Sequence, residues 1–130
     1  MTRILLDTMM LAWVIDWRSV DTRPSKADRD LIDTSTARLV SPISLFEIAT
    51  KARVGKWPDM EPHIAALESV IEYVGLKLAP IDTGILLDAA TLDWDHRDPF
   101  DRIITATARH LDVRIVTTDR AILRFQGGAV

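Results

Sequence analysis

The chain has 130 residues, of which 48% are hydrophobic and 27% charged, so its composition is that of one folded domain and excludes a disordered chain. It contains no cysteine, which excludes disulfides and thiolate metal sites and fits a reducing cytosol. The 16 basic and 19 acidic residues give a net charge of −3, which excludes a uniformly basic surface but not local clusters of Arg and Lys.

The longest apolar stretch near the start, MMLAWVI, lies between Asp7 and Asp16. It is too short to cross a bilayer, and no small-residue cleavage site follows it. We therefore expect a cytoplasmic protein without a membrane partner.

Short apolar runs alternate with amphipathic segments along the chain. The runs predict strands at about 3–6, 37–41, 77–81 and 114–118. The amphipathic segments predict helices at about 8–17, 25–35, 45–54, 61–74 and 83–92, one from HRDPFDR (96–102) to 111, and a short one after Asp119. Pro42 predicts a turn, Ser44 an N-cap and Gly55 a helix end, and a Gly127-Gly128 tail closes the chain.

Strands that alternate with helices are typical of right-handed βαβ units. No repeat and no long linker interrupts the pattern. The sequence therefore predicts an α/β fold: one sandwich over residues 1–130, with a short parallel sheet of four to five strands and helices on both faces.

Acidic residues follow or adjoin the predicted strand ends. Asp7 and Asp119 follow the first and last strands, and Glu47 lies in the first turn of the helix after the second strand. The carboxyl ends of parallel strands meet at one edge of a sheet, where ligands bind. Asp98 and Asp101 begin the helix before the last strand, and they reach the same edge if the 83–92 helix crosses back over the sheet.

Each acid also has a simpler interpretation. Asp7, Asp98 and Asp119 all stand where an N-cap is expected, and Glu47 suits a helix start because of the macrodipole. Converging carboxylates, by contrast, would repel one another and raise one another's pKa values unless a divalent cation were bound. Carboxylates without Cys or a His pair favour Mg²⁺ or Mn²⁺, whose usual chemistry is metal-assisted phosphodiester hydrolysis.

Four segments carry a family resemblance. DTMMLAW, SPISLFEIATKARVGK, HRDPFDRIITATA and VTTD resemble, in this order and spacing, the PIN-domain ribonucleases, in particular the VapC-type toxins of bacterial and archaeal toxin–antitoxin pairs. The similarity spans essentially the whole chain. It implies a PIN-like sandwich, Mg²⁺ or Mn²⁺ dependence, endonucleolytic cleavage of RNA with a metal-activated water molecule, and inhibition by a cognate antitoxin.

The resemblance also implies roles for individual residues. The four family acids match Asp7, Glu47, Asp101 and Asp119. Asp7 and Asp101 are then expected to bind a first metal ion directly, while Glu47 and Asp119 hold a second ion or orient water. The supporting positions are the extra acid of the HRDPFDR subgroup, Asp98, and two hydroxyls, Thr117 and Thr8. The Met9-Met10 pair departs from many relatives and alters the entrance to the site.

Other side chains are candidates for binding RNA or a protein. Lys51, Arg53, Lys56, Arg97 and Arg102 could hold the RNA backbone, although a solvated helix face explains each one singly and Arg102 could pair with Asp98 or Asp101. His96 could be a proton shuttle or phosphate contact, or a solvated loop residue. The apolar excess in Met9, Met10, Trp13, Val14, Trp17, Leu31 and Ile32 predicts, beyond its share of the core, a homodimer contact or a groove for the antitoxin.

Rival functions are weaker. A haloacid-dehalogenase-type phosphatase needs a second Asp where this chain has Met9, and no early acidic pair with a late Lys marks a response-regulator receiver. A non-catalytic PIN-like module that binds RNA or protein remains the alternative to the nuclease.

Overall fold

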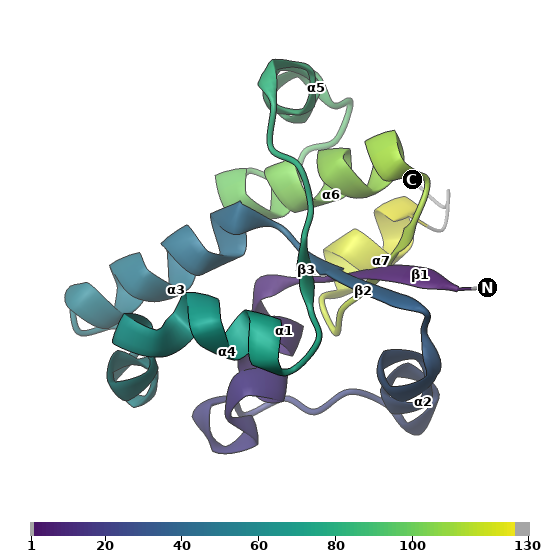
Figure 1. Cartoon of the computed structure of the whole chain (residues 1–130). Helices are drawn as coiled ribbons and strands as arrows, with labels where there is room; N and C mark the ends of the chain where they lie inside the picture. The colour runs from purple at the N-terminus through teal and green to yellow at the C-terminus, as the bar shows by residue number, and fades with distance from the viewer. Residues whose placement is uncertain (1, 127–130) are drawn as a thin grey trace.

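Four short parallel strands form a sheet at the centre of the structure, a computed structural model that describes residues 2–126 (Figure 1). They are β1 (Arg3–Leu6), β2 (Ala37–Val40), β3 (Lys77–Leu78) and β4 (Arg114–Val116), in the order β3-β2-β1-β4. Leu6 is in register with Val40 on one side and Val116 on the other. The predicted parallel sheet is confirmed, and the predicted Gly127-Gly128 tail lies outside the described residues.

Helices cover both faces of the sheet (Figure 1). The α-helices are α1 (Thr8–Ile15), α2 (Lys26–Thr34), α3 (Pro42–Arg53), α4 (Leu67–Tyr73), α5 (Thr83–Thr91), α6 (Pro99–Leu111) and α7 (Arg120–Gln126). Two 3-10 helices, η1 (Trp17–Ser19) and η2 (Pro58–Ala66), connect them. Among residues 2–126, no helix combines the length and the apolar character needed to cross a membrane.

The alternation of side chains along β1 divides the core between the two faces. Ile4 and Leu6 face the cluster made with α1, α2, α3 and α4, whereas Leu5 faces the cluster made with α6 and α7. All three side chains are fully buried. A central strand with apolar residues on both faces is the expected form of a parallel strand covered by helices, so the acid that follows β1 emerges from the middle of the core.

Three predicted elements were wrong in detail. Helix α3 begins at Pro42, with the Ser41 hydroxyl as N-cap, because proline suits the first helical position; Ser44 is a buried residue inside the helix. The predicted 61–74 helix is α-helical only from Leu67, because its first part belongs to η2, which begins at Pro58 and contains Pro62. Strand β3 stops before Pro80, which cannot extend the ladder.

The turn between α5 and α6 is fixed by one guanidinium group. Helix α5 packs along α6 (Figure 1), and the chain between them returns to the sheet edge. Arg102 on α6 donates to the carbonyls of Ala89 (2.8 Å) and Leu92 (2.8 Å). It also donates to the carbonyls of Trp94 (2.7 Å) and His96 (2.9 Å). The rigid fork of donors on arginine therefore holds the whole turn against α6.

Replacing Arg102 with lysine should destabilise the protein while keeping the charge. A single ammonium group cannot reach the carbonyls that the guanidinium serves, and they would lose charge-assisted hydrogen bonds. We expect Arg102→Lys to lower the free energy of unfolding in urea by about 2–3 kcal/mol. The exposed Arg97 gives the matched control, Arg97→Lys, with a change within about 0.5 kcal/mol. Equal stability of the two variants would contradict this role of Arg102.

Candidate metal centre

Asp7 lies at the carboxyl end of the central strand β1. Its backbone N–H donates to the carbonyl of Val116 (3.2 Å), which extends the pairing of β1 with β4 by one residue. Its side chain is only 4% exposed and caps α1 by accepting from the N–H of Met10 (2.9 Å). The other carboxylate oxygen accepts from the hydroxyl of Thr117. The predicted N-cap is therefore real, and it does not prevent Asp7 from belonging to an acidic site.

Thr117 connects two of the acids. Its hydroxyl donates to Asp7 and accepts from the backbone N–H of Asp119 (3.0 Å). Because the N–H can only donate, the hydroxyl proton is directed to the Asp7 carboxylate. The supporting hydroxyl predicted at Thr117 thus joins the ends of β1 and β4 at the site.

The electrostatic environment of Asp7 shows that acids distant in sequence converge. Burial raises its pKa to about 6 from the ordinary 3.8, against the opposing hydrogen bonds from Thr117 and Met10. The negative charges of Asp101 and Asp119 are a smaller part of the same increase in pKa. Three carboxylates from β1, α6 and the end of β4 therefore repel one another at one edge of the sheet.

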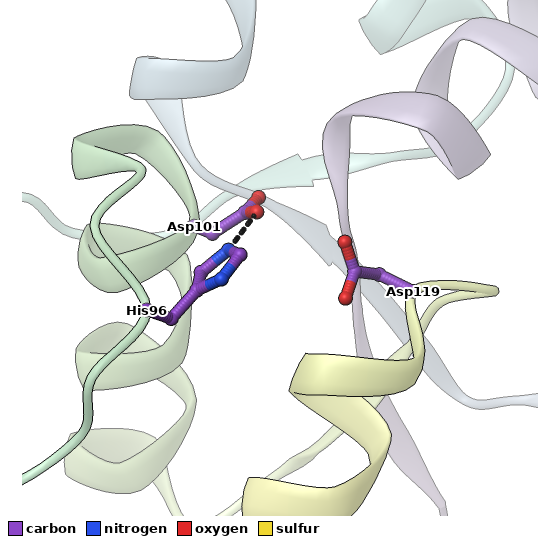
Figure 2. A group of neighbouring side chains, drawn as sticks. All are labelled: His96, Asp101 and Asp119. Atoms are coloured by element: carbon purple, nitrogen blue, oxygen red, sulfur yellow. Dashed lines mark hydrogen bonds and ion pairs between the residues drawn. The ribbon is translucent and has the colours of Figure 1, made fainter.

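Asp101, Asp119 and His96 lie near enough to one another to form a potential cation site (Figure 2). One ligand atom from each of His96, Asp101 and Asp119 lies within 4.8 Å of the other two. His96 Nε2 is 2.7 Å from Asp101 Oδ2. Burial raises the pKa of Asp101, with further increases from the charges of Asp98 and Asp119 and an opposing hydrogen bond from His96.

Asp119 serves a helix and the site at once. Its Oδ1 caps α7 by accepting from the N–H groups of Ala121 (2.8 Å) and Ile122 (3.2 Å). Figure 2 shows its carboxylate across a gap from Asp101 and His96. The cap fixes the side chain in this direction, so the capping and the metal-site interpretations of Asp119 are compatible.

Glu47 contributes a carboxylate from α3 that is only 6% exposed. Its Oε2 accepts from Lys51 Nζ at 2.6 Å, whereas its Oε1 is buried and has no hydrogen-bond partner. A buried carboxylate oxygen without a donor is costly.

The hydroxyl of Thr8, at the start of α1, donates to the hydroxyl of Ser44 (2.9 Å), which lies one turn before Glu47 on α3. This hydrogen bond joins the start of α1 to α3. Thr8 thus supports the site by packing the two helices and makes no hydrogen bond to Asp7.

The side chains fit a hard divalent cation. The unpartnered oxygen of Glu47 and the raised pKa values of Asp7 and Asp101 are both unfavourable features that a cation would relieve. The donors are carboxylates with one imidazole and no thiolate, which suits Mg²⁺ or Mn²⁺. Asp7 and Glu47 are not part of the His96–Asp101–Asp119 group, although Asp7 is near enough to Asp101 and Asp119 for their charges to raise its pKa.

Several candidate residues have local roles. Asp98 is the N-cap of α6, accepting from the N–H groups of Phe100 (2.8 Å) and Asp101 (3.2 Å). Arg102 pairs with neither acid among the described residues, and its donors are used by the α5–α6 turn. Arg53, Lys56 and Arg97 are exposed, and Lys51 is partly exposed beside Glu47. The sequence pattern gave little reason to include His96 in the site. The signal that could have found it is its position just before Asp98 and Asp101, at the start of the same helix.

Comparison with known proteins agrees with this geometry. A family model described as "PIN domain" matches residues 4–128, so the chain belongs to the PIN domain family. It is also similar to "Ribonuclease VapC22" of Mycobacterium tuberculosis (strain ATCC 25618 / H37Rv): 31% of 123 aligned residues are identical, covering 94% of this chain and 91% of that protein. The predicted family resemblance is confirmed.

The buried carboxylate of Asp7 should make the metal-free protein more stable in mild acid. Because its pKa rises from 3.8 to about 6 on folding, protonation favours the folded state: this contribution is complete below the lower value and is lost as the pH rises through about 6. We expect the free energy of unfolding to increase by about 1–2 kcal/mol between about pH 7.5 and 5 in the presence of a chelator.

Asp7→Asn isolates this contribution. The variant should melt several degrees above wild type at neutral pH without metal, and its stability should depend less on pH. Asp82→Asn, a change in the exposed N-cap of α5, is the control and should keep the wild-type pH dependence. A pH profile of Asp7→Asn that matches wild type would show that the Asp7 carboxylate titrates normally.

Proposed function

We propose that this protein is a metal-dependent endoribonuclease and the toxin of a type II toxin–antitoxin pair. The observation that carries the proposal is the convergence of the Asp7, Asp101 and Asp119 carboxylates at the carboxyl edge of the sheet. Membership in the PIN domain family and the similarity to a protein named a ribonuclease support the same chemistry. An RNA substrate places the activity in the cytoplasm.

The acids would hold Mg²⁺ or Mn²⁺. Asp7 and Asp101 are the proposed direct ligands of a first ion, and Glu47 and Asp119 hold a second ion or orient water. When bound, such a cation lowers the pKa of a water molecule and neutralises charge that develops on the scissile phosphate. No Ser–His or Cys–His nucleophile is required.

The protein's own contribution is to hold the acidic side chains in place and to offset part of the cost of ionising them. The Thr117 hydroxyl stabilises the charged form of Asp7 by hydrogen bonding, while Lys51 pairs with one oxygen of Glu47 and leaves the other for the site. The caps made by Asp7 and Asp119 fix both side chains on helix starts. Preorganised ligands of this kind lose little freedom when the cation and the phosphate bind.

Positive side chains are the proposed contacts to the RNA backbone. Lys51, Arg53 and Lys56 lie on or after α3, and Arg97 precedes the third acidic segment. Contacts of Lys and Arg with phosphate give affinity with little sequence readout. A non-catalytic RNA-binding module is the less favoured alternative, because a protein that only binds RNA gains nothing from buried, mutually repelling carboxylates.

The protein partner is proposed to be a cognate antitoxin. Among the apolar residues near the N-terminus, Met10 and Ile32 are buried in the core, whereas Met9 and Trp17 are 36% and 54% exposed. Arg23 lies over the Trp17 ring at 5.2 Å. We propose that the surface around the exposed side chains of Met9 and Trp17 contacts the antitoxin or, in a homodimer, a second copy of the chain.

Asp101 and Asp98 separate catalysis from capping within one helix start. Asp101→Asn keeps the shape of the side chain but removes a charge that the cation needs, so metal-dependent RNA cleavage should fall by roughly two orders of magnitude or more with the fold intact. Asp98→Asn retains a good N-cap and should lower cleavage by less than about tenfold. Both variants are to be compared with wild type on a panel of structured RNAs, with and without Mg²⁺ or Mn²⁺.

The two variants also test the proposed function itself. Circular dichroism and thermal melting first establish that each variant is folded. Full cleavage activity in folded Asp101→Asn would eliminate the nuclease mechanism proposed here. Loss of activity in wild type on adding a chelator, with recovery on adding back metal, is the positive expectation.

Trp17 should matter for the partner but not for the fold. We expect Trp17→Glu to weaken the complex with the product of a neighbouring small open reading frame by about tenfold or more, because exposed aromatic residues often dominate interfaces. Tyr73→Glu is the control, since Tyr73 is 92% exposed on α4 and lies outside the proposed surface. Wild-type affinity in folded Trp17→Glu would place the antitoxin contact elsewhere.

A further inference from the structure

We propose that a ring nitrogen of His96 binds the metal ion of the nuclease site, and that this ligand makes the site prefer Mn²⁺ to Mg²⁺. The inference rests on the proposed function, since the cation is the one that the nuclease uses. It adds a nitrogen ligand to the four acids that the family resemblance supplies, and it assigns a specific task to the first residue of the HRDPFDR segment.

The distances around His96 suit ligands of one ion. Neighbouring ligands of an octahedral ion with bonds of about 2.1 Å are about 3.0 Å apart, and opposite ligands about 4.2 Å apart. His96 Nε2 and Asp101 Oδ2 are 2.7 Å apart, close to the separation of neighbouring ligands. All three ligand atoms, including that of Asp119, lie within 4.8 Å of one another, so only small side-chain rotations separate this arrangement from a coordinated one.

The imidazole is held in place by contacts to its ring and to its backbone, unlike that of a solvated loop histidine. Trp94 stacks on the His96 ring, with centroids 4.7 Å apart and planes at 28°. Trp94 itself stacks on Phe125 of α7, with centroids 4.6 Å apart and planes at 23°. The backbone carbonyl of His96 accepts from Arg102 at 2.9 Å. These contacts fix the ring opposite Asp119, as Figure 2 shows.

The stacked rings also fix the position of His96 relative to Asp119. Phe125 and Asp119 belong to the same short segment, because Asp119 is the N-cap of α7 and Phe125 is near the end of that helix. Trp94 therefore joins the loop before α6 to the helix that carries the acid across the gap. The two sides of the potential metal site are packed together before any ion binds, which reduces the cost of assembling the ligands.

A nitrogen ligand changes which metal is favoured. Magnesium prefers oxygen ligands and near-ideal geometry, and it gives up its waters reluctantly. Imidazole suits transition metals, and Mn²⁺ accepts carboxylate and imidazole together. The competing arrangement is one in which His96 only donates a hydrogen bond to Asp101 and so orients that carboxylate. In that case no nitrogen reaches the ion, and replacing His96 does not lower the affinity for Mn²⁺ more than the affinity for Mg²⁺.

Electron spin-echo spectroscopy of Mn²⁺ added to the intact protein distinguishes the two arrangements without measuring activity. We expect modulation from a directly coordinated ¹⁴N nucleus in wild type, its loss in His96→Gln and its retention in His110→Gln. His110 is the matched control because it contacts Asp88 on α5, away from the acids. Titration calorimetry should show His96→Gln weakening Mn²⁺ binding by about tenfold or more, with Mg²⁺ binding changed by less than about threefold.

The outcomes separate the inference from the function it rests on. Tight Mn²⁺ binding to wild type without nitrogen modulation would refute the His96 ligand and leave the nuclease intact. Failure of both ions to bind at all would refute the metal-dependent nuclease as well. If His96→Gln does not fold, the His63→Gln/His110→Gln double variant decides the matter: the chain has 3 histidines, so retained modulation assigns the nitrogen to His96 and lost modulation excludes it.

Discussion

The repulsion between carboxylates at the end of the central strand is the constraint on which the site depends. Asp7 emerges from β1 between two buried faces of the sheet, so its charge has little water around it. Asp101 and Asp119 add negative charge nearby and raise its pKa further. The protein stabilises the ionised form only with short-range donors, from Thr117 and Met10. This incomplete compensation is an electrostatic cost that a bound cation would relieve.

The strand order makes this convergence unavoidable. With the order β3-β2-β1-β4, the first and last strands are neighbours, so the residues after each of them leave the sheet at the same edge. Thr117 exploits the adjacency by contacting Asp7 and the backbone of Asp119 together. Helix α3, which carries Glu47, starts after β2, the other neighbour of β1, and its first turn is hydrogen-bonded to the start of α1 beside Asp7. Each acid is thus positioned by its own strand or helix, and no flexible loop has to be ordered first.

Asp101 follows no strand directly, so the α5–α6 turn has to bring the start of α6 back to the edge of the sheet. Helix α5 carries the chain along α6, and Arg102 then holds the returning turn through its backbone carbonyls. The same turn presents Trp94 and His96, whose stacked rings extend to α7. Arg102, a candidate for RNA binding in the sequence, instead holds the turn that carries His96 beside the site. The other basic residues proposed to bind RNA, on and after α3 and at the exposed Arg97, take no part in this turn.

Much of this protein is determined by local sequence. Apolar runs with period and length typical of strands gave the four strands, and Asp, Ser and Pro at helix starts gave most helix boundaries, because capping depends on neighbouring residues only. The acids at the strand ends followed from the parallel topology, and the resemblance to PIN-domain ribonucleases predicted which acids to group. Errors arose in segments that contain proline: Pro42 begins α3, and Pro62 lies in the 3-10 helix that replaces the first part of the predicted 61–74 helix.

The tertiary structure decided what depends on contacts between distant segments. That Thr117 donates to Asp7, 110 residues earlier, follows from the pairing of β1 with β4 and from no local pattern. The unpartnered oxygen of Glu47, the use of Arg102 within the α5–α6 turn and the stacking that holds His96 likewise require three-dimensional packing. Sequence alone determined the kinds of ligand and their place along the chain. Only folding decided their mutual distances and burial, since the pKa of a carboxylate depends on how much water and how many charges surround it in space.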